Sequence, residues 1–350
     1  MNRFFTVDKQ NNRWSFFDPS GRLFFSLGMN HLDSATLRCA ENVHIWREKY
    51  RNSQQHWLME SVGPDLRAWG FNTVGWCQEV VIAAPTIHRH SRNFTREEYG
   101  WLDMPYCHLL PFTEAHQWEV ETRLPDVLSK DFSEWCDYVA RDHCVRMADD
   151  PNLIGYFYSD CPQWVHSPRP EMKPPWFDPE RLQTKSGREE LARMAERYYA
   201  VTRESIRRYD PNHLILGDRF EALAPLPDEV LLAAARHVDV LSFQCFADGK
   251  TICEQFKNWH KQTGKPILLA DGCVPGRRNK TPEDQNVYGS MLKMLRELSC
   301  CVGWHYCGAY LRNRVRRTGF REEDETINDQ DFIAAVTAAN HATAEWMHRL

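Results

Sequence analysis

The sequence has 350 residues, of which 42% are hydrophobic and 26% are charged, so disordered, collagen-like and coiled-coil proteins are excluded. Its 43 Lys and Arg against 48 Asp and Glu give a net charge of -5, which provides no general attraction for nucleic acid. No apolar run approaches the ~20 residues that a transmembrane helix needs. We therefore expect neither nucleic acid nor a membrane as a partner.

The 12 cysteines are irregularly spaced and form no CxxC pair, so we expect free thiols rather than a disulfide framework or a zinc ribbon. The first residues turn polar at once and lack the apolar segment of a signal peptide. We therefore expect a cytoplasmic protein.

Three short apolar segments come first in the chain, at residues 4–7, 14–17 and 23–27. The residues between them, 9–12 and 18–21, are polar and turn-forming. This spacing predicts a small β-hairpin within residues 1–23.

From there, apolar strand-like runs alternate with amphipathic helix-like segments. The predicted strands are 24–29, 71–76, 108–112, 154–159, 214–217, 238–243, 266–270 and 301–305. The predicted helices include 54–69, 132–148, 188–209, 228–236, 251–262 and 283–299, with 329–349 as a last helix on the outside. Eight strands buried on both faces, with helices between them, predict a single (β/α)8 barrel over residues 1–350. An open doubly wound sheet is disfavoured because no glycine-rich phosphate loop follows an early strand.

Polar residues follow the predicted strands at the end where a (β/α)8 barrel carries its active site. They are Asn30, His31, Gln78, Glu79, Glu114, Asp160, Asp218, Arg219, Gln244, Asp271, His305 and Tyr306. Asp160 and Asp271 stand out because each ends an otherwise apolar run, where a carboxylate is costly unless it is used. The long connections 32–53, 77–107, 161–187 and 308–328 belong to the same face of the barrel.

Several stretches resemble the agarase-type branch of the retaining (β/α)8-barrel glycoside hydrolases. They are FFSLGMNH at 24–31, GFNTVGW at 70–76, IGYF at 154–157, PNHLILGDRF at 211–220 and the strand that holds Trp304. They occur in order from about residue 13 to residue 310. The resemblance implies a Glu acid/base after strand 4, usually following an Asn, and a Glu nucleophile after strand 7. It implies no cofactor.

This sequence departs from that pattern at both catalytic positions. Cys161 stands at the acid position, Asp160 at the Asn position and Asp271 at the nucleophile position. Because Asp is shorter than Glu by one C–C bond of ~1.5 Å, an Asp pair is wider, and wider pairs are typical of inverting enzymes. We therefore predict a glycoside hydrolase in which Asp160 is the acid and Asp271 is the base or nucleophile.

Other interpretations of these residues stay open. Asp160 could orient a ligand as a hydrogen-bond acceptor, Asp271 could pair with Arg219 or Arg277, and Asp218 or Cys161 could take the acid role. The barrel could also bind sugar without cleaving it. Metal-assisted hydrolysis or elimination would need a site such as His88 with His90, or His305 with Asp271 and Asp160; no metal-binding motif supports either.

The remaining strand-end residues predict the surroundings of the sugar. We expect a substrate-binding set of Asn30, His31, Trp76, Glu79, Trp164, Asp218, Arg219, Gln244, Trp304 and His305, with the tryptophans as walls that stack on pyranose rings. Packing explains any single loop tryptophan equally well.

Cationic side chains gather in the loops after strands 7 and 8, at Arg277, Arg278, Lys280, Arg312, Arg314, Arg316, Arg317 and Arg321. Because guanidinium groups pair well with carboxylates and sulfates, this cluster predicts an anionic sugar as substrate. Pairing with Glu322, Glu323 and Asp324, or with a second subunit, is the alternative.

Overall fold

The computed structural model describes residues 3–83, 88–113, 126–167, 174–274, 287–313 and 319–350, and the side chains of residues 79–91 are also left out. Eight parallel strands close into a barrel in the order β10-β11-β12-β13-β4-β5-β8-β9. The strands are β4 (Ser26–Met29), β5 (Thr73–Val74), β8 (Tyr106–Leu109), β9 (Leu153–Asp160), β10 (Leu214–Glu221), β11 (Leu241–Gln244), β12 (Ile267–Gly272) and β13 (Cys301–Tyr306). The predicted (β/α)8 barrel is confirmed.

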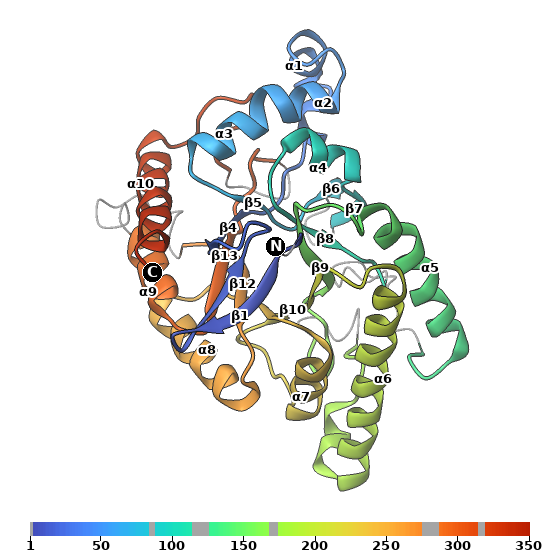
Figure 1. Cartoon of the computed structure of the whole chain (residues 1–350). Coiled ribbons are helices and arrows are strands. Elements are labelled where there is room, and N and C mark those ends of the chain that lie inside the picture. The colour runs from blue at the N-terminus through green and yellow to red at the C-terminus, as the bar shows by residue number, and fades with distance from the viewer. Residues whose placement is uncertain (1–2, 84–87, 114–125, 168–173, 275–286, 314–318) are drawn as a thin grey trace.

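Helices surround the barrel as an outer ring, which Figure 1 shows along the barrel axis. The larger ones are α5 (Lys130–Met147), α6 (Lys185–Tyr209), α7 (Asp228–His237), α8 (Gly249–Thr263), α9 (Val287–Glu297) and α10 (Gln330–Met347). Four of them begin at a side chain that accepts a hydrogen bond from the first turn, namely Ser129, Thr184, Asp248 and Asp329. Within the described ranges, none of the helices combines the length and apolar character needed to cross a membrane.

The predicted helix 54–69 is helical over residues 54–68, but it is not a uniform α-helix. It consists of α2 (Gln54–Trp57), one π-helical turn η2 (Leu58–Val62) and α3 (Gly63–Ala68). Pro64 lies in the first turn of α3, where its missing N–H removes a bond from a regular α-helical ladder. The change from π-helix to α-helix therefore lies next to the proline.

The long connections contain short elements that the sequence pattern did not predict. They are η1 (Ala35–Arg38), α1 (Val43–Glu48), the antiparallel pair β6 (Gln78–Ala83) and β7 (His88–Asn93), α4 (Arg96–Leu102) and η3 (Pro179–Gln183). These elements are too short to show a clear hydrophobic period.

The predicted N-terminal hairpin is confirmed as β1 (Thr6–Gln10) and β2 (Arg13–Phe17), extended by β3 (Leu23–Phe24). Phe5 and Phe16 are buried in one cluster with strand residues such as Ile154 and Leu268. In Figure 1 the hairpin crosses in front of the ring of strands. It therefore covers the end of the barrel at which the strands begin.

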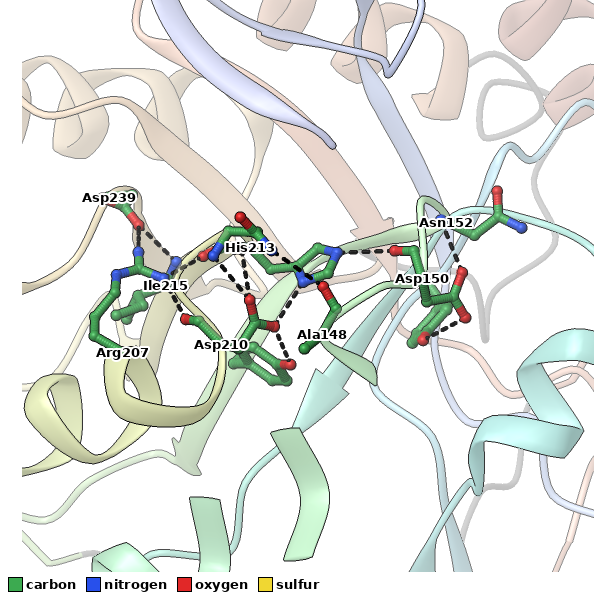
Figure 2. A network of polar contacts seen from close by, with 11 residues as sticks. Ala148, Asp150, Asn152, Arg207, Asp210, His213, Ile215 and Asp239 are labelled. Carbon is green, nitrogen blue, oxygen red and sulfur yellow. Dashed lines mark hydrogen bonds and ion pairs between the residues drawn. The ribbon is translucent and has the colours of Figure 1, made fainter. Parts of the chain in front are cut away.

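A polar network connects the segments that precede β9 and β10 (Figure 2). The Asp210 carboxylate accepts hydrogen bonds from Tyr156 Oη (2.6 Å), His213 Nδ1 (2.6 Å) and the Asn212 backbone N–H (2.9 Å). His213 also contacts the Asp150 carbonyl oxygen through Nε2, at 2.8 Å. Burial would raise the pKa of Asp210, but these donors outweigh burial and lower it. The network ties two strand beginnings together through an ionised, fully buried side chain.

Candidate active site

Asp160 and Asp271 converge on one guanidinium at the carboxyl ends of the strands. Asp160 ends β9, and Asp271 lies near the end of β12, with 6% and 4% of their surfaces exposed. Arg219 Nη2 lies 2.7 Å from Asp160 Oδ1, and Arg219 Nη1 lies 3.9 Å from Asp271 Oδ2. Both carboxyl groups therefore contact one planar guanidinium, which places them at the same end of the barrel with a single side chain between them.

Arg219 is a buried cation on β10, 1% exposed, with its guanidinium carbon 4.0 Å above the centre of the Trp76 ring. Its Nε also donates to Asp160 Oδ1 at 3.0 Å. Burial would lower the pKa of Arg219, but Asp160 and Asp271 outweigh burial and raise it. The guanidinium of Arg219 is therefore held by the Trp76 ring and by the carboxylates of Asp160 and Asp271. Its Nη1 makes no hydrogen bond within the described residues.

Asn30 holds Asp271 from the other side. Its Nδ2 donates to Asp271 Oδ1 at 2.6 Å and to the Ala270 carbonyl oxygen at 2.9 Å. Its Oδ1 accepts from the Trp76 backbone N–H at 2.8 Å. A Cβ at Gly75 would collide with Asn30 Oδ1, so the glycine makes room for the amide. The Asp271 carboxylate is thus oriented by an amide on one oxygen and faces a guanidinium with the other.

His31, Asp271 and Cys307 form a second group at the same end of the barrel. His31 Nε2 lies 3.9 Å from Asp271 Oδ1 and 3.7 Å from Cys307 Sγ. One donor atom from each of the three residues lies within 4.8 Å of the other two. These are residue types that bind transition-metal ions.

His305 lies inside the barrel core rather than at its mouth. It is fully buried, its Nε2 is 2.8 Å from Ser26 Oγ, and its ring contacts Phe157 edge-on. Burial, assisted by the Arg219 charge, lowers the pKa of His305 to about 3. The imidazole is therefore neutral at physiological pH and does not carry a proton for a reaction there.

Asp218 faces the opposite way from Arg219, because successive side chains of a strand alternate. Tyr198 and Tyr199 of α6 donate to its two oxygens at 3.0 and 2.6 Å, and the Ser159 backbone N–H donates at 2.9 Å. Burial raises the pKa of Asp218 to about 6 despite these donors. Asp218 is therefore bound by Tyr198 and Tyr199 rather than by Arg219. These hydrogen bonds connect the barrel to α6.

Trp164 and Trp304 also face the helices. Each is 1% exposed. Trp164 packs edge-on against Trp176 and Tyr198, and Trp304 stacks on Tyr288 of α9 at 4.7 Å between ring centres. Their contact with sugar stays a prediction, but this packing matches the alternative of core residues.

Three more predicted residues are Gln244, Glu79 and Cys161, and the structure describes the side chains of Gln244 and Cys161. Gln244 is buried beside Asp271, its partner in the β11–β12 pairing. Glu79 lies in β6, and its side chain is outside the described residues, as are those of His88 and His90. Cys161 has a pKa raised well above its usual value, mainly by burial, so its thiol is protonated and unreactive.

The structure describes only Arg312 and Arg321 of the predicted cationic cluster. Arg312 pairs with Glu322 at 2.7 Å, as the alternative interpretation expected for this loop. Arg321 pairs with Asp65 at 2.6 Å and also donates to the Glu325 carbonyl oxygen. Arg277, Arg278, Lys280, Arg314, Arg316 and Arg317 lie outside the described residues. The described members of the cluster therefore bind protein carboxylates.

Cys307 was not identified from the sequence as a candidate site residue. It directly follows β13, and its position at a strand end is the signal that would have identified it. The pairing of Asp271 with Arg219, one of the interpretations left open, is confirmed at 3.9 Å. The contact of Arg219 with Asp160 was missed, because no sequence pattern shows that a side chain of β10 reaches the ends of both β9 and β12.

Solved structures with a similar arrangement of strands and helices include two agarases and a β-D-glucuronidase. An agarase is 16% identical over 98% of this chain and 63% of its own, with a TM-score of 0.71. An exo-β-agarase is 15% identical over 99% of this chain and 65% of its own, with a TM-score of 0.74. A β-D-glucuronidase from Dictyoglomus thermophilum is 13% identical over 97% of this chain and 54% of its own, with a TM-score of 0.58.

The sequence itself matches no protein-family model and no curated protein. This chain spans just under two thirds of the length of the two agarases. Identities of 13% to 16% bear on the arrangement of the chain and leave its chemistry open. On the strength of the closed eight-stranded barrel and these structural likenesses, the chain has the fold of the agarase-type (β/α)8-barrel glycosidases.

Proposed function

We propose that this protein is a glycoside hydrolase that uses Asp160 and Asp271 as its carboxyl pair. The observation that carries the proposal is the convergence of both carboxylates on Arg219 at the active-site end of a glycosidase-type barrel. Glycoside hydrolysis needs two carboxyl groups on either side of the scissile bond. The contact of both carboxylates with one guanidinium supports their acting on one bond.

Asp271 fits the role of base or nucleophile. Its Oδ1 accepts from Asn30, and its Oδ2 faces Arg219. Both neighbours stabilise a carboxylate anion and fix its direction. An ionised and oriented carboxylate can either activate a water molecule or attack the anomeric carbon.

Asp160 fits the role of acid only after a rearrangement. Arg219 contacts Asp160 Oδ1 through both Nε and Nη2, and a cation in contact favours the ionised form of a carboxyl group. A general acid must hold a proton when the substrate is bound. We infer that a bound sugar draws Arg219 away from Asp160 and toward itself, so that Asp160 becomes protonated.

The substrate class follows from the same cation. We propose an oligosaccharide with an anionic sugar, because Arg219 Nη1, which makes no hydrogen bond within the described residues, suits a carboxylate or sulfate. Two structural neighbours, a β-galacturonidase from Eisenbergiella tayi and the β-D-glucuronidase, carry names that refer to uronic acids. Inversion of the anomeric centre remains our prediction for an Asp pair.

The test is a panel of neutral and anionic oligosaccharides incubated with the purified protein and with two variants, Asp160→Asn and Asp271→Asn. We expect hydrolysis of at least one anionic substrate and loss of turnover in both variants, while substrate binding persists. Asp248→Asn is the matched control, because Asp248 is exposed at the start of α8. Undiminished turnover in either active-site variant would contradict the assignment.

A sugar-binding barrel without hydrolytic activity is the second candidate. It is favoured by the ion pair itself, because Arg219 occupies the space between two carboxylates that are both at least 94% buried. Measurable binding of oligosaccharides with no hydrolysis across the panel would select this candidate.

A further inference from the structure

We propose that His31, Asp271 and Cys307 form a binding site for a thiophilic divalent cation of the Zn²⁺ class. The three residues offer one nitrogen, one oxygen and one sulfur, a ligand set that suits zinc. His31 and Asp271 are buried and Cys307 is partly buried. A metal ion at this place would enter from the mouth of the barrel.

Two of the three separations between the ligand atoms are close to those of a tetrahedral site, and all three are within 4.8 Å. Zinc bonds of ~2.0 Å to nitrogen, ~2.1 Å to oxygen and ~2.3 Å to sulfur place the ligand atoms about 3.4 to 3.6 Å apart. His31 Nε2 lies 3.7 Å from Cys307 Sγ and 3.9 Å from Asp271 Oδ1. Small side-chain movements would therefore bring all three atoms onto one ion and leave a fourth position open.

The backbone holds the three residues in place. They come from the ends of β4, β12 and β13, which are adjacent in the order of the barrel. The Cys307 N–H donates to the Gly272 carbonyl oxygen at 3.0 Å, and the His31 N–H donates to the Trp76 carbonyl oxygen at 2.8 Å. Sites built on strand ends are more rigid than sites on loops.

His31 adopts an unusual backbone conformation at this place. Its φ is +59°, in the left-handed region that few residues other than glycine occupy. Strained backbone of this kind gathers at active and ligand-binding sites. Eight other described non-glycine residues also have a positive φ, so the ligand set rather than the backbone carries the proposal.

The charges of the neighbourhood also balance. A divalent cation with the Cys307 thiolate and the Asp271 carboxylate is neutral, and among the described residues Arg219 keeps Asp160 as a carboxylate partner. Asn30 donates to Asp271 Oδ1 and so orients the carboxylate from behind, as outer-shell partners do at metal sites. Binding would release the thiol proton of Cys307 to solvent.

The consequence for activity rests on the proposed glycoside hydrolase function. An ion bound to Asp271 would occupy the lone pairs that this residue needs as base or nucleophile. We therefore infer that Zn²⁺ inhibits hydrolysis in competition with the substrate, and that a chelator reverses the inhibition.

The binding test uses Co²⁺ as a spectroscopic probe on the full chain, under reducing conditions and after removal of metal by a chelator. We expect one Co²⁺ per chain, a thiolate-to-cobalt absorption band and displacement of cobalt by Zn²⁺. Cys307→Ser should abolish the band, and His31→Gln should weaken binding at least tenfold, with thermal unfolding measured to show that both variants fold. Cys39→Ser and Cys273→Ser are controls, because both thiols are partly exposed and lie outside the proposed ligand set.

Two results would overturn the site: a Co²⁺ spectrum without a thiolate band, or a band that survives in Cys307→Ser. Because this measurement needs no substrate, it stands whether or not hydrolysis is found. In an active preparation, Zn²⁺ inhibition equal in the unmodified protein and in Cys307→Ser would overturn the inhibitory role alone.

Discussion

The strands β9 and β10 carry a buried ionic cluster at each end. Where they begin, His213 Nδ1 lies 2.6 Å from Asp210 Oδ2, and each residue has further hydrogen-bond partners (Figure 2). Where they end, Asp160 and Arg219 form the pair that also approaches Asp271. The same two strands thus hold one network around Asp210 and another around Arg219.

The difference lies in how fully each charge is satisfied. At the beginning of the strands, Asp210 receives hydrogen bonds on both oxygens, including two from backbone N–H groups. At the end, one guanidinium serves two carboxylates and keeps one nitrogen without a hydrogen bond inside the described residues. Fully satisfied buried polar networks rigidify a fold, whereas a guanidinium nitrogen that lacks a hydrogen bond among the described residues can pair with a ligand. The first cluster therefore joins the beginnings of the two strands, and the second is the one on which the proposed function rests.

The largest expected effect comes from Asp271→Asn, at the strand ends. Turnover should fall by about a thousandfold or more, because the base or nucleophile is lost while the shape of the side chain is kept. The unfolding free energy should change by about 1 kcal/mol or less, because Asp160 still pairs with Arg219. Initial rates and urea unfolding measure the two effects. A large loss of stability with unchanged turnover would place Asp271 among the structural residues.

The next effect comes from the same substitution at the strand beginnings, Asp210→Asn. We expect a loss of about 2 to 4 kcal/mol in unfolding free energy, because the amide cannot accept all the hydrogen bonds of the carboxylate. The turnover of the folded fraction should be unchanged. Since the pKa of Asp210 is lowered in the fold, its ionised form stabilises the protein above about pH 4, and this contribution is lost as the pH falls through the folded pKa. Urea unfolding at several pH values tests both parts, and an equal deficit at acid and neutral pH would contradict the second.

Asp218 should show the opposite dependence on pH. Its pKa is raised to about 6, mainly by burial, so the neutral acid is the form that the fold favours. Its contribution is therefore complete below about pH 4, the usual unfolded pKa, and is lost as the pH rises through about 6. Relative to Asp218→Asn, the unmodified protein should lose on the order of 2 to 3 kcal/mol between pH 4 and 7. Parallel stability profiles of the two proteins over this range would refute the assignment.

The smallest effect is expected at the rim. Arg312 pairs with Glu322, and both side chains are partly exposed, at 43% and 29%. Arg312→Ala should therefore cost about 1 kcal/mol or less in unfolding free energy, and less still at high salt. Arg321→Ala is the contrast, because Arg321 is 18% exposed and also bonds a backbone carbonyl. If thermal unfolding shows a larger loss for Arg312→Ala than for Arg321→Ala, burial does not determine how much these ion pairs stabilise the fold.

Much of the barrel could be predicted from the sequence. All eight strands were found because strands buried on both faces are continuous apolar runs, such as residues 154–159 and 266–270. The bounds of short strands shifted, as for β5 (Thr73–Val74), where only two residues pair inside the predicted 71–76. Pairing depends on the neighbouring strand, so a single sequence does not define it.

The candidate site was predicted less completely. Strand-end position correctly brought Asp160, Asp271, Asn30 and His31 to one end of the barrel. It could not show that Asp218 and Trp304 face the helices, because the side on which a strand residue lies depends on twist and on bulges such as the one between Leu269 and Gly272. A one-residue shift exchanges the two faces.

By itself, the sequence determined which segments form the barrel and which polar residues end its strands, because hydrophobic periodicity and turn residues act locally. Only the tertiary structure decided that Arg219 lies between two carboxylates and that Cys307 meets His31 and Asp271. These contacts join residues up to 276 positions apart. Their geometry follows from closure of the barrel, which brings the ends of the strands together around one axis.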